Sequence, residues 1–497
     1  MHSRGPRMAP WAAAASAAVL LLAGCTLGPD YARPALDVPE RFRAEAAAGP
    51  LEPAAADGLW WRAFGDAQLD ALVDEGLAHN QDVAAAAARV DQFHGVLATT
   101  RAPLFPQLGA GLAGDRTRAS GQTISPAPGI NPYNNVQASL QASWEIDLFG
   151  RTRRLTESAA AQLNASEAAR RATVLSVVAA VCAGYVRLRD LDSEVEVARS
   201  TVGLRSDSLR LFERRRSGGV VSDLEVSQAR SEYASALRTL QQLQQQAAAQ
   251  ENALSVLVGR NPGPIVRGLT IQQLRMPLVP SGLPSQLVER RPDLLAAEQQ
   301  LVAANAQIGA ARAAYFPSIS LTGAFGNASR SLSDLWSGSA RTWTYGAGIS
   351  VPIFTAGAIG GQVESAEAGQ RVALANYRQA VQTAFRETDD ALVGVRQTQL
   401  ARDATQQQTD ALANYARLAR KRYEGGYTSY LEVLDAERSL FNAQLQLSQS
   451  QADVLVQATQ LYKALGGGWV DLADTRAPQP LAAPPRPAPT APPAPGS

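Results

Sequence analysis

The chain has 497 residues, 46% of them hydrophobic, and its 46 basic side chains nearly balance 45 acidic ones. At about 150 residues per domain, this length suggests about three domains. Long helices or an internal duplication can account for the same length without three separate cores. A formal charge of +1 lacks the basic excess that neutralises phosphates, which excludes nucleic acid as a partner. No apolar run beyond the N-terminus reaches the roughly 20 residues of a spanning helix, which excludes an inner-membrane transporter. Two cysteines and three histidines provide neither a disulfide framework nor a His-based metal cluster, so no cofactor is expected.

The N-terminal residues have the pattern of a targeting segment. Two arginines precede an apolar stretch over residues 11–22, which ends in Leu-Ala-Gly-Cys at Leu22–Cys25. This pattern predicts a lipobox: residues 1–24 are a signal peptide, and Cys25 begins the mature chain with a diacylglycerol on its thiol and an acyl chain on its amine. Thr26, rather than an aspartate, follows the cysteine, which resembles the outer-membrane sorting of bacterial lipoproteins. The alternative is an ordinary signal peptide with a cysteine near its cleavage site.

One large unit occurs twice in the sequence. Residues 215–226 match residues 422–433 at an offset of 207, with identical Arg, Gly-Gly, Ser, Leu, Glu and Val positions. Such a repeat is far too long for a solenoid. The predicted organisation is a lipidated N-terminal segment (25–64), a first repeat (65–264), a linker (265–284), a second repeat (285–474) and a Pro/Ala-rich disordered tail (475–497).

Two strands are expected in each repeat, at about 107–148 and about 317–353. From Val136 to Leu148 apolar and polar residues alternate without exception, which predicts a strand with one apolar and one polar face. The alternative, a soluble sandwich, needs more strands than the sequence provides. The length of these strands suits a tilted membrane strand, and their small, Gly-rich polar face suits the lumen of a barrel.

Long helices follow the strands in each repeat. Apolar residues at a 3-4 spacing from Val174 to Phe212 form a heptad seam, which predicts a helix of about 155–216, roughly 90 Å long. With the Gly-Gly breaks, this gives long helical hairpins at about 151–259 and about 358–466. Cys182 lies on an apolar stretch and is predicted to be a small buried residue. The Ala- and Gln-rich remaining faces suit either an ordinary solvated surface or the inner wall of a hollow bundle.

Closure of the sheet decides the architecture. Four strands leave two open edges, and each unsatisfied backbone group in hydrocarbon costs several kcal/mol. The chain must therefore form an oligomer, and only the larger barrels enclose an aqueous lumen. The expected fold is mainly α, with long coiled-coil-like helices and a small membrane β part.

These features together resemble a known family. The run Arg-Tyr-x-x-Gly-x-x-x-Tyr-Leu-x-x-Leu-Asp-Ala at residues 422–436 and the Gly-Gly-Gly-Trp ending at 466–469 are similar to those of the TolC-like outer membrane factors. With its lipobox, the chain is most similar to the lipoprotein (NodT-type) branch that serves RND multidrug pumps. The resemblance covers residues 25 to about 474.

The resemblance implies a homotrimer with a twelve-stranded outer-membrane β-barrel and a periplasmic α-barrel. Such a trimer is a passive exit duct of a tripartite efflux pump, exporting drugs or other small molecules with an inner-membrane RND transporter and a periplasmic adaptor. No catalytic motif is present, which agrees with a protein that is not an enzyme. The alternative is a structural envelope lipoprotein with a helical stalk and no transport, although a stalk does not need alternating strands. A glycosidase with paired carboxylates would need a large concave domain, for which the chain has no room.

The resemblance also assigns roles to residues at the helix tips. The adaptor-docking tips are expected at the two Gly-Gly breaks, Gly218, Gly219 and Val220 in the first repeat and Gly425, Gly426 and Tyr427 in the second. Glycine there permits a tight reversal, so a purely structural turn is the alternative, and both interpretations can hold.

Just beyond the second tip, the resemblance implies a periplasmic gate. Leu431, Asp435 and Arg438 match positions that form the constriction in relatives, and Glu432, one residue inside, is assigned to the gate with them. Leu431 and Asp435 share one helix face, so a trimer would present rings of leucines and carboxylates. The alternative is a solvated carboxylate paired with Arg438. Thr428 stands where some relatives carry an arginine that ties the closed tip, which puts a latch of that kind in doubt.

Overall fold

The computed structural model describes residues 26–39, 41–43, 59–120, 122, 131–277, 288–467 and 475–481. The predicted signal peptide, Cys25 and most of the Pro/Ala-rich tail lie outside the described residues. The chain divides into two compact units. The strand unit comprises residues 1–35, 92–165 and 297–377, and the helical unit comprises residues 36–91, 166–296 and 378–497.

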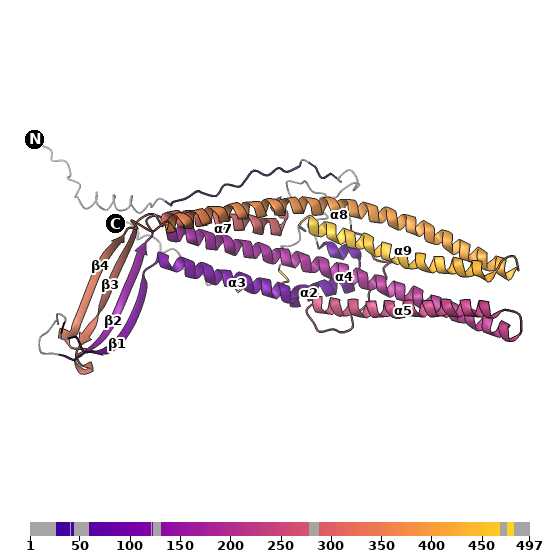
Figure 1. Ribbon diagram of the computed structural model, residues 1–497, viewed down its shortest axis with the longest axis horizontal. Helices are drawn as coiled ribbons and strands as arrows, with labels where there is room; N and C mark the ends of the chain where they lie inside the picture. Colours follow the sequence, from indigo (N-terminus) through magenta and orange to yellow (C-terminus); the bar gives the residue numbers. More distant parts are fainter. Residues whose placement is uncertain are drawn as a thin grey trace, which may run out of the picture. The chain divides into compact units, whose positions relative to one another are not determined.

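The strand unit contains one antiparallel sheet of four strands (Figure 1). Its strand order is β1-β2-β3-β4, so the two repeats meet where β2 pairs with β3. The edge strands β1 and β4 each pair with one neighbour among the described residues. The strands are β1 (Gln107–Thr117), β2 (Tyr133–Ile146), β3 (Ser318–Ser329) and β4 (Arg341–Ser350).

The register gives the sheet one apolar and one polar face. Leu140 lies opposite both Ala110 and Phe325, and Phe325 lies opposite Trp343, so these side chains share a face. The alternate positions, such as Ser139, are small or polar on all four strands. No second sheet covers the apolar face within the described part of the chain, and Trp343 keeps 66% of its surface exposed. The predicted alternation is therefore confirmed, and the apolar face requires a non-aqueous environment.

Both predicted strand pairs end slightly earlier than expected. β2 stops at Ile146 because the carboxylate of Asp147 accepts the backbone N–H groups of Thr152 and Arg153, at 3.0 and 2.9 Å, which starts the next helix. β4 stops at Ser350, two residues before Pro352, which has no N–H to donate to a strand ladder.

The helices adjoin the sheet at one end of its strands. α3 (Gln81–Arg101), continued by the 3-10 turn η4 (Ala102–Leu104), precedes β1, and α7 (Pro292–Ala313) precedes β3. α4 (Arg151–Ser217) follows β2, and α8 (Ala358–Glu424) follows β4. Because the strands are antiparallel, the β1–β2 and β3–β4 connections both lie at the opposite end, which we call the distal end of the sheet.

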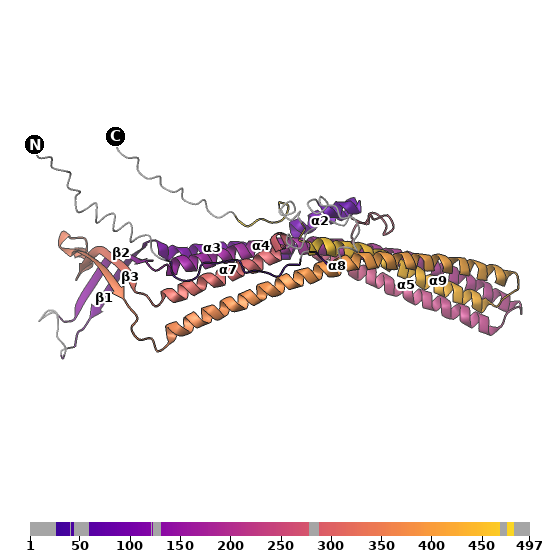
Figure 2. The same ribbon diagram turned by 90° about the horizontal axis from the view of Figure 1, so that it is seen from above.

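Two helical hairpins dominate the helical unit (Figure 2). α4 continues into α5 (Asp223–Leu257), and α8 continues into α9 (Tyr430–Ala464). The long helices have 67 residues each and the returning helices have 35 each, at the same offset of 207. The tandem duplication therefore extends to the helix boundaries. The unit also contains α2 (Ala67–His79) and the 3-10 helix η3 (Trp60–Phe64).

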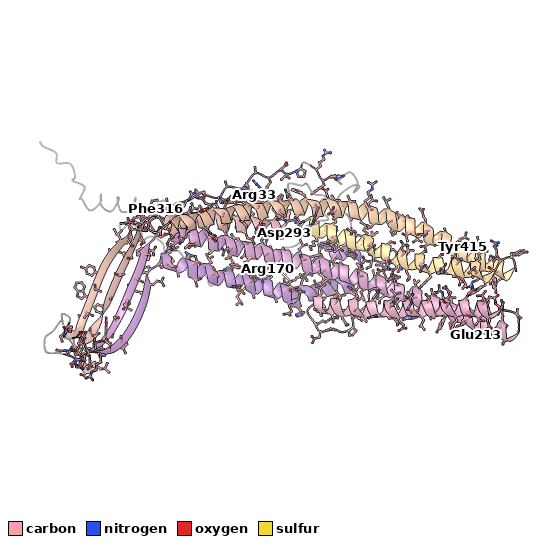
Figure 3. The ribbon with its side chains drawn as sticks, in the orientation of Figure 1. Arg33, Arg170, Glu213, Asp293, Phe316 and Tyr415 are labelled. Carbon is pink, nitrogen blue, oxygen red and sulfur yellow. The ribbon has the colours of Figure 1, made fainter. Side chains whose placement is uncertain are left out.

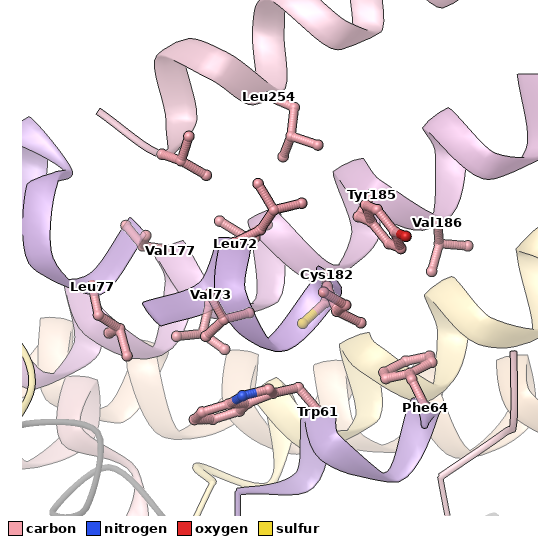
Figure 4. Packing of buried hydrophobic residues seen from close by; sticks show 14 of the residues in the cluster. Trp61, Phe64, Leu72, Val73, Leu77, Val177, Cys182, Tyr185, Val186 and Leu254 are labelled. Atoms are coloured by element: carbon pink, nitrogen blue, oxygen red, sulfur yellow. The ribbon is translucent and has the colours of Figure 1, made fainter. Parts of the chain in front are cut away.

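The core of the helical unit gathers around the middle of α4 (Figure 4). Trp61 and Tyr185 are fully buried there, and Cys182 is a buried free cysteine, as predicted. Asp66 caps α2 and also accepts the Tyr185 hydroxyl at 2.7 Å. Burial and this carboxylate raise the pKa of Tyr185 above its usual value. By length and composition α4 contains an apolar stretch that could cross a membrane, but 56% of that stretch is buried inside the protein.

Candidate functional site

The two helix tips have the same backbone hydrogen bonding. At the first, the N–H of Val220 donates to Arg215 O at 2.9 Å and that of Gly219 donates to Arg216 O at 2.8 Å. At the second, the N–H of Tyr427 donates to Arg422 O at 2.9 Å, and the equivalent glycine bond is 3.0 Å. Both patterns are Schellman motifs, in which a left-handed glycine ends the helix.

Glycine is required at one position of each tip. Gly219 has a φ of 74° and Gly426 a φ of 77°, values that residues with a Cβ rarely adopt. The residues that follow them, Val220 and Tyr427, are 74% and 82% exposed. An apolar residue at this position commonly packs back on its own helix, whereas these two side chains remain largely exposed.

A hydrogen bond and a small core join the two tips to each other. Nη1 of Arg215 donates to the Tyr423 hydroxyl at 3.1 Å. Below it the rings of Phe212 and Tyr430 lie 4.2 Å apart, within a cluster of buried residues from all four helices. Tyr415 and Glu213 mark this region of α8 and α4 (Figure 3). The two hairpins therefore present their tips as one surface of the helical unit.

The tips differ in how their first-turn glutamates are used. Glu225 accepts the backbone N–H of Ser222 at 2.7 Å as part of a capping box, and this hydrogen bonding lowers the pKa of Glu225. The equivalent Glu432 instead accepts Arg422 Nη1 at 3.1 Å, together with the Thr428 hydroxyl. Glu432 is thus tied to the end of α8, a contact that the sequence did not reveal.

The four predicted gate residues lie together on the first turns of α9. Arg438 Nη2 donates to Asp435 Oδ1 at 2.8 Å, and both side chains are about half exposed. Leu431, one turn before Asp435, is 60% exposed. With Thr428 and Glu432 they line one side of a groove of about 570 Å³. Both interpretations of the sequence include the Asp435–Arg438 pair, so the gate remains a prediction.

A buried acidic pair between α4 and α9 was missed by the sequence analysis. Asp190 accepts the Ser448 hydroxyl at 2.7 Å, and Glu194 accepts Gln449 Nε2 at 2.6 Å. Both acids are nearly fully buried. Burial and the charge of Asp190 raise the pKa of Glu194 to about 7. The signal in the sequence was two acids four residues apart beside the apolar seam of α4.

The described N-terminal segment is docked on the strand unit. The guanidinium of Arg154, whose side chain is only 5% exposed, donates to Leu27 O at 3.0 Å and to Asp30 at 2.7 Å. Further along, Nη2 of Arg33 donates to Glu298 at 2.8 Å (Figure 3). A Cβ on Gly28 would lie 2.4 Å from the Cα of Gly309, so the two backbones touch. This segment leads back to Cys25, which lies outside the described residues.

The described residues contain no group of three or more His, Cys, Asp or Glu side chains placed to hold a metal ion. The family model for outer membrane efflux proteins matches residues 72–260 and 283–467. The chain belongs to the outer membrane efflux protein family. The two matched stretches correspond to the two copies of the repeat.

Curated relatives of the chain are named as efflux components. It is 37% identical over 460 residues to the probable efflux pump outer membrane protein TtgC of Pseudomonas putida, covering 91% of this chain and 94% of the relative. It is 35% identical over 458 residues to the cation efflux system protein CusC of Escherichia coli, covering 90% and 97%.

A solved channel has the same fold. The open state of the MtrE outer membrane channel of Neisseria gonorrhoeae is 32% identical to the chain, with a TM-score of 0.77, and the similarity covers 90% of this chain and 99% of that one. The expected TolC-like fold, outer-membrane location and role as an efflux exit duct are therefore confirmed. A structural stalk protein without transport does not fit this membership.

Proposed function

We propose that three copies of this chain close a twelve-stranded barrel in the outer membrane and continue it as a helical duct into the periplasm. The observation that carries this proposal is the single four-stranded sheet with an exposed apolar face and two edge strands. In hydrocarbon both edges must be paired, and the small, polar opposite face is suited to a water-filled lumen. Pairing β4 of one copy with β1 of the next satisfies all edges.

The duct works with an inner-membrane RND transporter and a periplasmic adaptor, and it has no catalytic activity of its own. The exposed Val220 and Tyr427, on tips held by matching hydrogen bonds, support docking of the adaptor at this surface. Relatives of comparable identity are named for toluene efflux and for cation efflux. That difference supports a passive duct, with the drug or other small molecule chosen by the pump.

Cys25 anchors the mature chain through diacylglycerol and N-acyl chains. Two or more acyl chains hold a protein stably at a membrane, at about 0.8 kcal/mol for each buried methylene. The docked segment from Leu27 to Arg33 supports this role, because it fixes the start of the mature chain to the strand unit.

The gate is proposed at Leu431 and Asp435, with Arg438 as the tie. Three carboxylates around one axis attract cations and repel one another, so a basic partner for each is needed to hold the ring together. The 2.8 Å contact from Arg438 to Asp435 supports that pairing. Glu432 stabilises the turn at the second tip through its contact with Arg422.

Two measurements test the proposed function. Detergent-corrected light scattering of the purified protein should give the mass of a trimer, and a stable monomer would contradict barrel closure. In cells that lack their own outer membrane efflux channel, the gene supplied with a cognate pump and adaptor should restore drug resistance. Resistance that stays at the level of the empty vector would contradict the exit-duct role.

A further inference from the structure

The apolar face of the sheet ends in basic and amide residues at the distal end. On β4 the sequence runs from Tyr345 and Trp343 to Arg341, and on β1 it runs from Leu112 to Arg116, all at alternate positions of the same face. The stacked rings of Trp343 and Tyr345, 5.4 Å apart, lie next to the arginine. Aromatic residues of this kind sit at the boundary between hydrocarbon and headgroups.

These arginines are exposed and carry no ion pair within the described residues. The acids near this end are engaged elsewhere. Asp115 lies on the opposite face of β1 and accepts the Thr117 hydroxyl at 2.9 Å, and Asp334 accepts the Ser331 hydroxyl at 2.7 Å. Neither carboxylate is paired with these arginines, so both guanidinium groups of this rim are open to an anion.

A hollow in the apolar face adjoins the rim. It measures about 450 Å³. It is lined by small and by larger apolar side chains, among them Ala110, Ala138, Leu112, Leu140, Phe325 and Trp336. The amide of Asn327 lies on its basic side, opposite Arg341. An apolar hollow beside a cationic rim is complementary to a molecule with an acyl chain and an anionic headgroup.

We propose that the distal rim binds a phosphate-bearing, acylated lipid of the outer leaflet, with an acyl chain in the hollow and its phosphate on Arg116 and Arg341. Guanidinium groups bind phosphate through paired hydrogen bonds, which gives this headgroup an advantage over an uncharged one. The inference rests on the proposed closure of the trimer. There β4 of one copy adjoins β1 of the next, so Arg341 and Arg116 flank each subunit seam and one phosphate can contact both.

Native mass spectrometry of the detergent-purified trimer tests this site. The probes are lipid A, its dephosphorylated form and inorganic phosphate. We expect lipid A to remain bound, the dephosphorylated form to bind about tenfold more weakly, and millimolar phosphate to leave the bound lipid in place. Equal binding of the two glycolipids, or full displacement by phosphate, would overturn the inference.

Variants distinguish a specific effect of the rim arginines from a general effect of positive charge. The double change Arg116→Gln and Arg341→Gln should lower lipid A binding about tenfold, and Ala138→Leu should lower it by partly filling the hollow. Arg330→Gln is the matched control, since it removes one exposed positive charge from the β3–β4 connection. The double change to lysine keeps the charge but loses the paired hydrogen bonds, so it should bind lipid A more weakly than wild type and more tightly than the glutamine double variant.

The outcomes for lipid and for assembly are read separately. A glutamine double variant that remains trimeric and supports efflux but loses lipid A supports the site. The same variant with unchanged lipid A binding contradicts the proposed lipid site and does not affect the proposed exit-duct function. A wild-type protein that does not form a trimer would instead contradict the proposed function.

Discussion

The contact of Asp435 with Arg438 joins two half-exposed side chains at the start of α9. An exposed ion pair of this kind adds about 0–1 kcal/mol to stability, so the fold does not depend on it. The pair would instead matter in a three-fold symmetric trimer, because unpaired carboxylates near one axis repel one another. Changing both residues to Ala should therefore open the pore without unfolding the protein.

Planar-bilayer conductance measures this prediction. Asp435→Ala alone should lower cation selectivity, and the double change with Arg438→Ala should lower it and also raise conductance well above wild type. The control is the double change of Glu437 and Arg420 to Ala, which removes an ion pair between α9 and α8. If conductance and selectivity stay at wild-type values in both Asp435 variants, the constriction lies elsewhere and the solvated-carboxylate interpretation is correct.

Glu194 predicts a pH dependence of stability. Its pKa is raised from 4.5 to about 7 in the folded protein, chiefly by burial. The folded state therefore holds the proton more tightly than the unfolded state, and stability falls as pH rises between about 4.5 and 7. The raised pKa of the neighbouring Asp190 acts in the same direction, while Arg187, which contacts Asp190 and Asp453, opposes it.

The midpoint of thermal unfolding at about pH 5.5 and pH 8 checks this sign. Wild type should lose on the order of 2 kcal/mol of stability over that range, and Glu194→Gln should lose much less because it keeps a neutral polar group there. Glu196→Gln, on an exposed acid of the same helix, is the control. A wild-type midpoint that rises with pH would contradict the assignment.

The local sequence predicts a residue's role where the backbone geometry alone requires that residue type. Gly219 and Gly426 could be predicted because a tight reversal needs a left-handed residue. The contact of Glu432 with Arg422 could not, because it depends on how two helix ends approach in space. The burial of Asp190 and Glu194 could not be predicted for the same reason, because it depends on how α9 packs against α4, and the spacing of the two acids alone does not show it.

At the scale of elements, periodicity predicted the strands and hairpins because each has one face in a distinct environment. A period of two over β2 and of 3.5 over α4 reports directly on that environment. Element ends were less predictable. The stop of β2 depends on a cap at Asp147, and that of β4 on Pro352. The docked N-terminal segment has no periodic pattern and was not foreseen.

The sheet makes a prediction about its two faces. Ala142 lies on the apolar face of β2, opposite Leu108 and Gly323, and Ser143 is the next residue, on the polar face. Arginine on a lipid-facing strand position costs about 2–4 kcal/mol at the midplane and less toward the interfaces, whereas a lumen position tolerates it. Ala142→Arg should therefore reduce insertion, and Ser143→Arg should not.

Membrane fractionation and heat-modifiable gel migration report on that insertion. The two variants add the same side chain one residue apart, so each controls for the other. Reduced insertion of Ser143→Arg with normal insertion of Ala142→Arg would mean that the apolar face does not contact lipid.

At the scale of the whole molecule, the two repeats share one architecture but differ in the contacts of individual residues. The hairpin helices of the two repeats have identical lengths, so the duplication sets the duct and its pair of tips. The differences are where regulation is expected: Glu225 caps its own helix, whereas Glu432 and Asp435 contact arginines near the predicted gate. The proposed lipid anchor precedes the first repeat and has no counterpart in the second.

The last prediction concerns that anchor. Thr26 packs against the backbone where β2 passes into α4, since a Cβ on Gly150 would lie 3.0 Å from the Cα of Thr26. This is the end of the sheet from which the helices leave, so a lipid on Cys25 would start at the membrane boundary opposite the distal rim.

Mass spectrometry of the mature wild-type protein should find an N-terminal cysteine that carries diacylglycerol and an N-linked acyl chain. Cys25→Ser should abolish both modifications and impair or redirect signal cleavage. Cys182→Ser is the matched control, because this cysteine is buried in the core and should leave acylation unchanged. An unmodified N-terminus at any other residue of the wild-type protein would show that the Leu-Ala-Gly-Cys sequence is not a lipobox.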